Sequence, residues 1–335
     1  MKKPVAALTL VSVAAFALAG CSAAPAAGGS DDGKIQVVAS TNVYGSLAEQ
    51  IGGDRVEVTS IISSATQDPH SYESSARDRL AVQNAELVIE NGGGYDSFIE
   101  ELLDGSDPEV VTAVEYAHDY PGADGHEGDA HAEDEHAEDE HADEHADEHA
   151  DEGHEGHDHV EGFNEHVWFD PHTMVDVVGA IADELTELDP AGKADFAASA
   201  AKIVADLEGF EADLDALKTE AAGAPVFITE PLPGYIAAAA GLTDVTPAGF
   251  AEAVEEGADV APATLLEALA VIENGQAKVL LTNAQTGGSE TQRVEGAAEA
   301  AGIPVVAFTE LLEDGSSYSE WMRDAIQNLA DALHS

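Results

Sequence analysis

Short apolar runs alternate with helical patterns along most of this chain, and this alternation restricts the folds open to it. Apolar runs bounded by turn residues are typical of buried strands, and apolar residues three or four positions apart are typical of helices. Strands that alternate with helices usually form a parallel sheet. The expected strands are 35–40, 56–62, 87–90, 110–114, 226–229, 279–282 and 305–308, and the expected shorter helices are 46–51, 77–85, 97–103, 233–240, 262–273, 290–301 and 318–333.

Two longer helical stretches divide these strands into two sets. Asp170-Pro171 is a good helix start, because Asp caps a helix and Pro fits its first turn, and the pattern then continues to about residue 188. A second helix is expected over 190–222. The sequence therefore predicts an α/β protein of two lobes with mainly parallel sheets, 34–189 and 223–335, joined by one long rigid helix.

A low-complexity segment interrupts the first lobe. Residues 121–160 contain nine His and seventeen acidic residues but no Lys or Arg. Such a composition cannot build a core, so we expect a disordered insert over 115–162. Its histidines suggest weak zinc binding, and a purely solvating role is the alternative. The histidines concerned are His126, His131, His136, His141, His145, His149, His154, His157 and His159.

The first 20 residues are typical of a lipoprotein signal peptide. Lys2 and Lys3 precede an apolar run that is too short to span a membrane comfortably. Leu18-Ala19-Gly20-Cys21 resembles a bacterial lipobox, although an ordinary signal peptide with an incidental Cys is the alternative. We expect lipidation of Cys21, a flexible tether over 21–33, and a lipid-anchored protein on the extracellular face of the bacterial cell membrane.

The charge of the chain points to cations as its ligands. There are 12 Lys and Arg against 67 Asp and Glu, a formal net charge of −55. A polyanion repels nucleic acid, so we exclude nucleic-acid binding. The single Cys excludes a disulfide framework and a Cys-rich zinc site.

Four candidate metal ligands lie near the ends of expected strands. His70 follows the strand 56–62, and His166 precedes the helix that begins near Pro171, while Glu230 and Glu310 each follow a strand of the second lobe. Because the carboxyl ends of parallel strands share one edge of a sheet, we expect these four side chains to face one cleft. Taken singly, each could also be an ordinary loop residue.

Several segments of the chain carry a resemblance to a known family, namely 39–44, 68–73, 166–168, 229–235, 283–286, 302–311 and 318–322. Together they resemble the TroA/ZnuA-like family, the metal-binding lipoproteins of bacterial ABC importers for zinc and manganese. The family implies two lobes joined by a rigid helix, with the metal between them. By position the family implies His70 and His166 as ligands from the first lobe. It implies Glu230 and Glu310 as ligands from the second lobe, at positions where members carry His or Glu and commonly Asp, respectively. His172 matches no family ligand.

The resemblance implies a solute-binding protein that captures Zn²⁺ outside the cell and delivers it to the permease of an ABC transporter, and we expect a monomer. Mn²⁺, or mixed binding of Zn²⁺ and Mn²⁺, is the alternative, because Glu at the position of Glu230 occurs in manganese binders. An extracellular metal buffer or adhesin without a transport role is a further alternative. No enzyme is expected, since the chain contains neither His-Glu-x-x-His nor Gly-x-Ser-x-Gly, and four ligands leave no open position for a substrate.

Overall fold

The computed structural model of this chain describes residues 33–64, 66–121, 160, 162–313 and 315–335. The expected signal peptide, Cys21, all but the last residue of the tether and the nine histidines of the insert lie outside these residues. Within the described part of the chain, no helix is both long and apolar enough to cross a bilayer.

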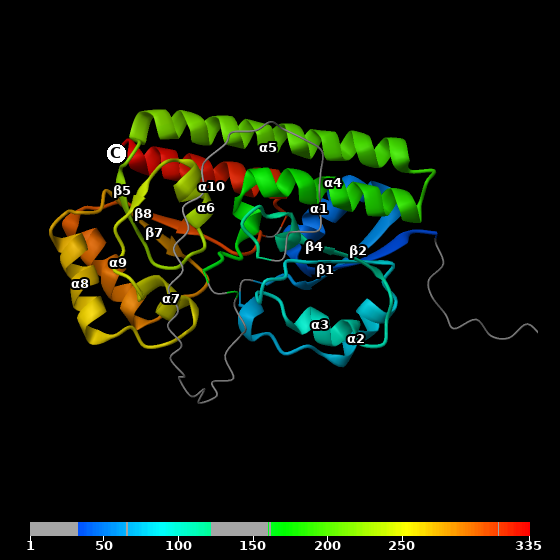
Figure 1. Ribbon diagram of the computed structural model, residues 1–335, viewed down its shortest axis with the longest axis horizontal. Coiled ribbons are helices and arrows are strands. Elements are labelled where there is room, and N and C mark those ends of the chain that lie inside the picture. The colour runs from blue at the N-terminus through cyan, green and yellow to red at the C-terminus, as the bar shows by residue number, and fades with distance from the viewer. Residues whose placement is uncertain (1–32, 65, 122–159, 161, 314) are drawn as a thin grey trace, which may run out of the picture. The chain divides into compact units, whose positions relative to one another are not determined.

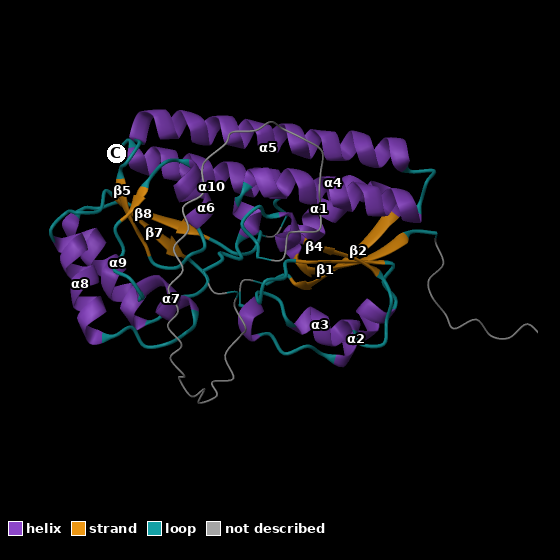
Figure 2. Ribbon diagram, viewed as in Figure 1, coloured by secondary structure: helices purple, strands orange, loops and turns teal. Residues whose placement is uncertain are grey.

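The first lobe is built on a parallel sheet of four strands (Figures 1 and 2). Helices α1 and α4 pack on one face of this sheet, and α2 and α3 pack on the other. Alternate residues of a strand point to opposite faces, so Val37 enters the first layer and Val38 the second. The strands are β1 (Ile35–Thr41), β2 (Val56–Ile62), β3 (Leu87–Glu90) and β4 (Glu109–Thr112), in the order β2-β1-β3-β4, and the helices are α1 (Asn42–Gly52), α2 (Ala76–Gln83), α3 (Phe98–Leu103) and α4 (Pro171–Leu188).

The second lobe repeats this layered plan with another parallel sheet of four strands. Helices α6 and α10 cover one face, and α7, α8 and α9 cover the other. Its strands are β5 (Pro225–Ile228), β6 (Thr243–Asp244), β7 (Val279–Asn283) and β8 (Val305–Phe308), in the order β6-β5-β7-β8, and its helices are α6 (Gly234–Ala239), α7 (Phe250–Glu255), α8 (Pro262–Glu273), α9 (Ser289–Ala301) and α10 (Tyr318–Leu333).

The helix α5 (Lys193–Ala221) runs along both lobes, as Figure 1 shows. Its buried residues, from Phe196 to Leu217, join one continuous apolar cluster that also takes in α1, α4, α10 and a face of each sheet. The two lobes therefore share a core instead of having separate ones. The predicted fold class, two parallel α/β lobes with one long linking helix, is confirmed.

Several local boundaries differ from the sequence-based expectation. Helix α1 begins at Asn42, directly after β1, and not at residue 46. Strand β4 ends at Thr112, where the chain turns into a 3-10 helix over Ala113–Tyr116. Strand β6 and helix α7 were not expected, because with two and six residues they are too short to show a clear periodic pattern.

The described residues on either side of the insert lie together. The ring centroids of Tyr120 and Phe163 are 5.1 Å apart. Tyr116 and Ala117, which fall inside the expected range of 115–162, pack against the shared core. The two described flanks of the insert therefore lie at one place in the first lobe, beside the segment that carries His166.

Candidate metal centre

His70 follows β2 and sits in a 3-10 helix formed by Pro69–Ser71. Asp68 caps this turn: its Oδ1 accepts from the backbone N–H of His70 at 3.0 Å, and its Oδ2 accepts from the Ser71 hydroxyl at 2.8 Å. The imidazole ring lies edge-on to Tyr95, with centroids 5.0 Å apart. The Asp-Pro-His sequence thus fixes the backbone of His70 through Asp68, and Tyr95 orients its ring.

His166 is buried, with 2% of its surface exposed, and Asn164 holds its ring. The Nδ1 atom of His166 lies 2.7 Å from Oδ1 of Asn164. An amide oxygen can only accept, so Nδ1 carries a hydrogen, and in the neutral ring the lone pair is then on Nε2. The indole of Trp168 packs against the imidazole at 5.1 Å between centroids. His166 therefore presents Nε2, the nitrogen that can bind a metal, from an apolar wall.

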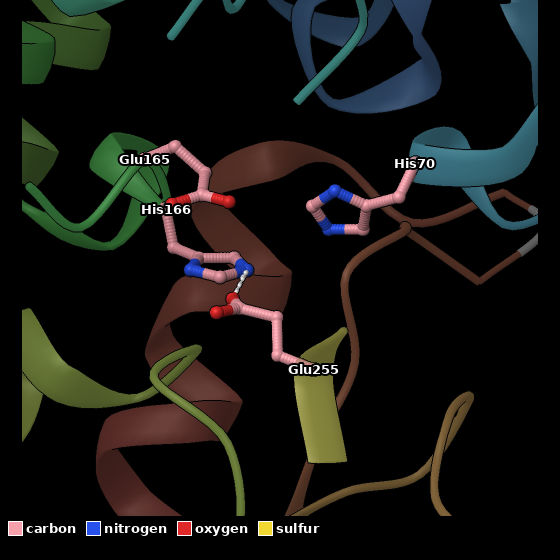
Figure 3. A group of neighbouring side chains, drawn as sticks. All are labelled: His70, Glu165, His166 and Glu255. Atoms are coloured by element: carbon pink, nitrogen blue, oxygen red, sulfur yellow. Dashed lines mark ion pairs between the residues drawn. The ribbon is translucent and has the colours of Figure 1, made fainter. Parts of the chain in front are cut away.

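Two glutamates meet these histidines, as Figure 3 shows. One ligand atom from each of His70, Glu165, His166 and Glu255 lies within 4.8 Å of the other three. The Nε2 atom of His166 is 3.7 Å from Oε1 of Glu255. Two nitrogens and two carboxylate oxygens at this spacing form a set that can surround a divalent transition metal.

Glu230 and Glu310 occupy a neighbouring position at the ends of β5 and β8. Both accept hydrogen bonds from the same amide, since Asn283 Nδ2 lies 2.9 Å from Glu230 and 2.7 Å from Glu310. The Thr286 hydroxyl also donates to Glu230, and the Tyr95 hydroxyl donates to Glu310 at 3.1 Å. A cavity of about 80 Å³ adjoins Glu310. Among the described residues, these two glutamates are not part of the four-residue group.

The acids of this region are buried close to one another, and that arrangement raises their pKa values. Burial raises the pKa of Glu310 to about 7, with the charge of Glu230 adding to the effect. Burial and the neighbouring glutamates raise the pKa of Glu255 to about 9. The pKa of Glu230 is also raised by burial, although its hydrogen bonds from Thr286 and Asn283 oppose the shift. Crowded buried carboxylates favour a bound cation, because the cation offsets their mutual repulsion.

The structure thus brings the two predicted histidines together and buries both predicted glutamates beside them. Whether Glu230 and Glu310 bind metal stays a prediction. Sequence reasoning missed Glu165 and Glu255 as candidates. The first adjoins His166, which was a usable signal, but Glu255 is one acid among several in its segment. His172, which was not expected to be a ligand, is 78% exposed and faces Glu211 at 3.5 Å.

The segment Asn283-x-Gln285-Thr286 organises the second half of the site. Besides the bonds of Asn283 and Thr286 to the glutamates, Oε1 of Gln285 accepts from the backbone N–H groups of Glu310 and Leu311. One short loop after β7 therefore fixes both the carboxylates and the backbone of the loop after β8.

A family model supports the resemblance seen in the sequence. Residues 37–332 match the model of ZnuA, described as the periplasmic component A of a zinc-uptake complex. The match covers both lobes and α5.

Curated relatives and solved structures agree with this match. The zinc-binding lipoprotein AdcA of Streptococcus pneumoniae is 28% identical over 207 residues, which is 61% of this chain and 36% of AdcA. The manganese-binding lipoprotein MntA of Halalkalibacterium halodurans is 27% identical over 204 residues, 60% of this chain and 56% of MntA. The aligned parts thus span less than two thirds of either relative. The periplasmic zinc-binding protein TroA of Treponema pallidum shares the fold, with a TM-score of 0.67 at 18% identity over 90% of this chain and 99% of TroA.

Proposed function

The chain belongs to the ZnuA family of zinc-uptake components, and we propose that it captures a divalent metal ion, with zinc as its preferred cargo, for an ABC importer. It would act as the substrate-binding component of that importer and not as an enzyme. The observation that carries the proposal is the meeting of His70 and His166 with carboxylates inside one 4.8 Å group.

The donor set supports zinc over manganese. Two imidazole nitrogens suit zinc, whereas manganese sites are usually dominated by oxygen donors. The buried carboxylates around the histidines would also suit manganese, which is the named metal of MntA. Two histidines and two carboxylates balance the charge of either ion.

A competition titration tests this proposal. The purified chain is titrated with Zn²⁺ and with Mn²⁺ against a chelating indicator of known affinity. We expect one tight site per chain and a preference for zinc of at least about a hundredfold. Tighter binding of manganese would replace zinc by manganese as the cargo, equal affinity would contradict a preference for zinc, and the lack of any tight site would reject the proposal.

We further propose that the chain works at the outer face of the bacterial membrane, anchored through Cys21, and delivers the metal to a permease as a monomer. The names of AdcA and MntA as lipoproteins support the anchor. A deletion strain separates transport from an extracellular buffer or adhesin. The transport role requires impaired growth under zinc limitation and slower ⁶⁵Zn uptake, both restored by the intact gene. Uptake at the parental rate would favour the buffer or adhesin.

The insert would add weak zinc binding close to the tight site. Its nine histidines can bind zinc only as neutral imidazoles, so its affinity should decline below about pH 6.5. Its two described flanks meet at Tyr120 and Phe163, and Phe163 is two residues from Glu165. Metal held by the insert would therefore be concentrated near the segment that carries Glu165 and His166.

A further inference from the structure

We propose that Glu165 and Glu255 complete, with His70 and His166, a cation position that does not use Glu230 or Glu310. The inference rests on the proposed metal-binding function and adds two ligands that the family resemblance does not supply. It assigns to α7, a short helix of the second lobe, a direct role in holding the ion.

The geometry of the four side chains carries this proposal. Figure 3 shows the two glutamates and His70 directed toward the ring of His166. Their ligand atoms already lie within 4.8 Å of one another. A metal ion bound at about 2.0–2.2 Å from each donor separates its ligand atoms by roughly 3–4 Å, so small rotations of the side chains would complete the shell.

The second lobe fixes Glu255 in this position through α7. Phe250 anchors the start of the helix in the core, with its ring 5.3 Å from that of Phe227 and no exposed surface. The helix ends at Glu255, and the N–H of Gly257 returns to the carbonyl of Val254. Glu255 therefore leaves the last turn of an anchored helix, and 12% of its side chain is exposed.

The first lobe fixes Glu165 just as firmly. Glu165 is 3% exposed, and its backbone carbonyl accepts from Nδ2 of Asn91 at 3.0 Å. Asn91 also accepts a hydrogen bond from the Tyr44 hydroxyl within the core. One carboxylate thus comes from each lobe, and an ion bound to both would link the lobes directly.

Glu230 and Glu310 lie outside the four-residue group and have hydrogen-bond donors of their own. Oε1 and Oε2 of Glu310 accept from Asn283 and Tyr95 respectively, and Oε2 of Glu230 accepts from Asn283 and Thr286. A site with two nitrogen and two oxygen donors needs both His70 and His166. The pair Glu165 and Glu255 and the pair Glu230 and Glu310 would each use these two histidines, so the two positions are alternatives for one ion.

A substitution at Glu255 with a matched neighbour tests the inference on the full chain. Glu255→Gln removes the carboxylate but keeps the size of the side chain, and Glu255→Asp keeps a shorter carboxylate. Glu256→Gln makes the same change of charge one residue later, at an exposed position. Zinc affinity is measured by competition with a chelator, and Co²⁺ absorption in the visible range reports the coordination of the ion.

We expect Glu255→Gln to weaken zinc binding by roughly tenfold or more and to change the Co²⁺ spectrum. Glu255→Asp should recover part of both, and Glu256→Gln should match the parent. If Glu255→Gln and Glu256→Gln both match the parent in affinity and spectrum, the inference is wrong. His70→Ala separates the two proposals. If His70→Ala loses zinc binding while Glu255→Gln keeps the parental affinity, only this inference is wrong. If His70→Ala also binds zinc as tightly as the parent, the proposed function is wrong as well.

Discussion

Asn164 is the residue that connects the orientation of His166 with the junction of the lobes. Its Oδ1 accepts from Nδ1 of His166, and its Nδ2 donates to the carbonyl of Pro231 at 3.1 Å. The hydroxyl of Tyr235 donates to the backbone carbonyl of Asn164 at 2.7 Å. Gly234 leaves the necessary room, because a Cβ there would lie 2.7 Å from Nδ2 of Asn164. One amide thus positions the ring of His166, a predicted metal ligand, against the second lobe.

Substitution of Asn164 separates these two roles. Asn164→Ala removes the acceptor for His166 and the bond to Pro231, so we expect zinc affinity to fall by about 10- to 100-fold, as for other residues that orient a metal-binding histidine. Asn164→Asp keeps an acceptor for Nδ1 but loses the donor to Pro231. We expect Asn164→Asp to retain more affinity than Asn164→Ala in a competition titration. Equal losses would mean that the bond to Pro231, and not the hold on His166, governs binding.

The elements of the fold were largely predictable, because their signals are local. The buried strands and the helix α5 follow from apolar runs and from apolar spacing, and each lies within a few residues of its expected range. Helix α7 has only six residues, too few for its apolar spacing to stand out. Its place depends on burial of Phe250 against Phe227 of β5, an element that α6 and β6 separate from it in the sequence. The role of Glu255 therefore required the folded chain, whereas His70 and His166 stand in local motifs.

The end of β3 carries an acid whose protonation depends on folding. Glu90 is 9% exposed, and the Thr112 hydroxyl donates to its Oε1 at 2.8 Å. Burial, with the charge of Asp96 adding to it, raises the pKa of Glu90 from 4.5 to about 8. The folded chain therefore takes up a proton at this site. The contribution of this proton to the free energy of unfolding is fully present below about pH 4.5 and is lost as the pH rises toward 8.

Glu90→Gln should remove this dependence on pH, because an amide side chain does not titrate. The amide oxygen can still accept the hydrogen bond from Thr112. We expect the variant to match the parent in free energy of unfolding near pH 4.5 and to exceed it increasingly above, by up to about 3 kcal/mol at pH 7. Urea denaturation between pH 5 and 8 measures the difference. Glu101→Gln, at an exposed position of α3, controls for the lower net charge. A constant difference across this range would contradict the shifted pKa.

At the scale of the whole molecule, the negative charge and the tight site are separate features. Seventeen of the 67 acidic residues belong to 121–160, so the lobes are strongly acidic as well. The resulting field can gather cations, but it does not specify where an ion is held. That specification comes from the two lobes, which share one core and each contribute carboxylates to the region around His70 and His166.

Deletion of residues 121–160 should therefore remove weak zinc binding and leave the tight site. The flanks of the insert already meet at Tyr120 and Phe163, so a short linker can close the gap. Isothermal titration with zinc should show one tight equivalent in both proteins and further weak equivalents only in the parent. Loss of the tight equivalent in the deletion variant would place essential ligands inside the insert.

The most direct test of the whole account is the zinc affinity of three single-histidine variants. His70→Ala and His166→Ala each remove one nitrogen donor, and His172→Ala removes an exposed histidine that lies outside the group. In a chelator competition on the full chain, we expect the first two to lose at least about a hundredfold in affinity and the third to match the parent. Parental affinity in either His70→Ala or His166→Ala would contradict the account.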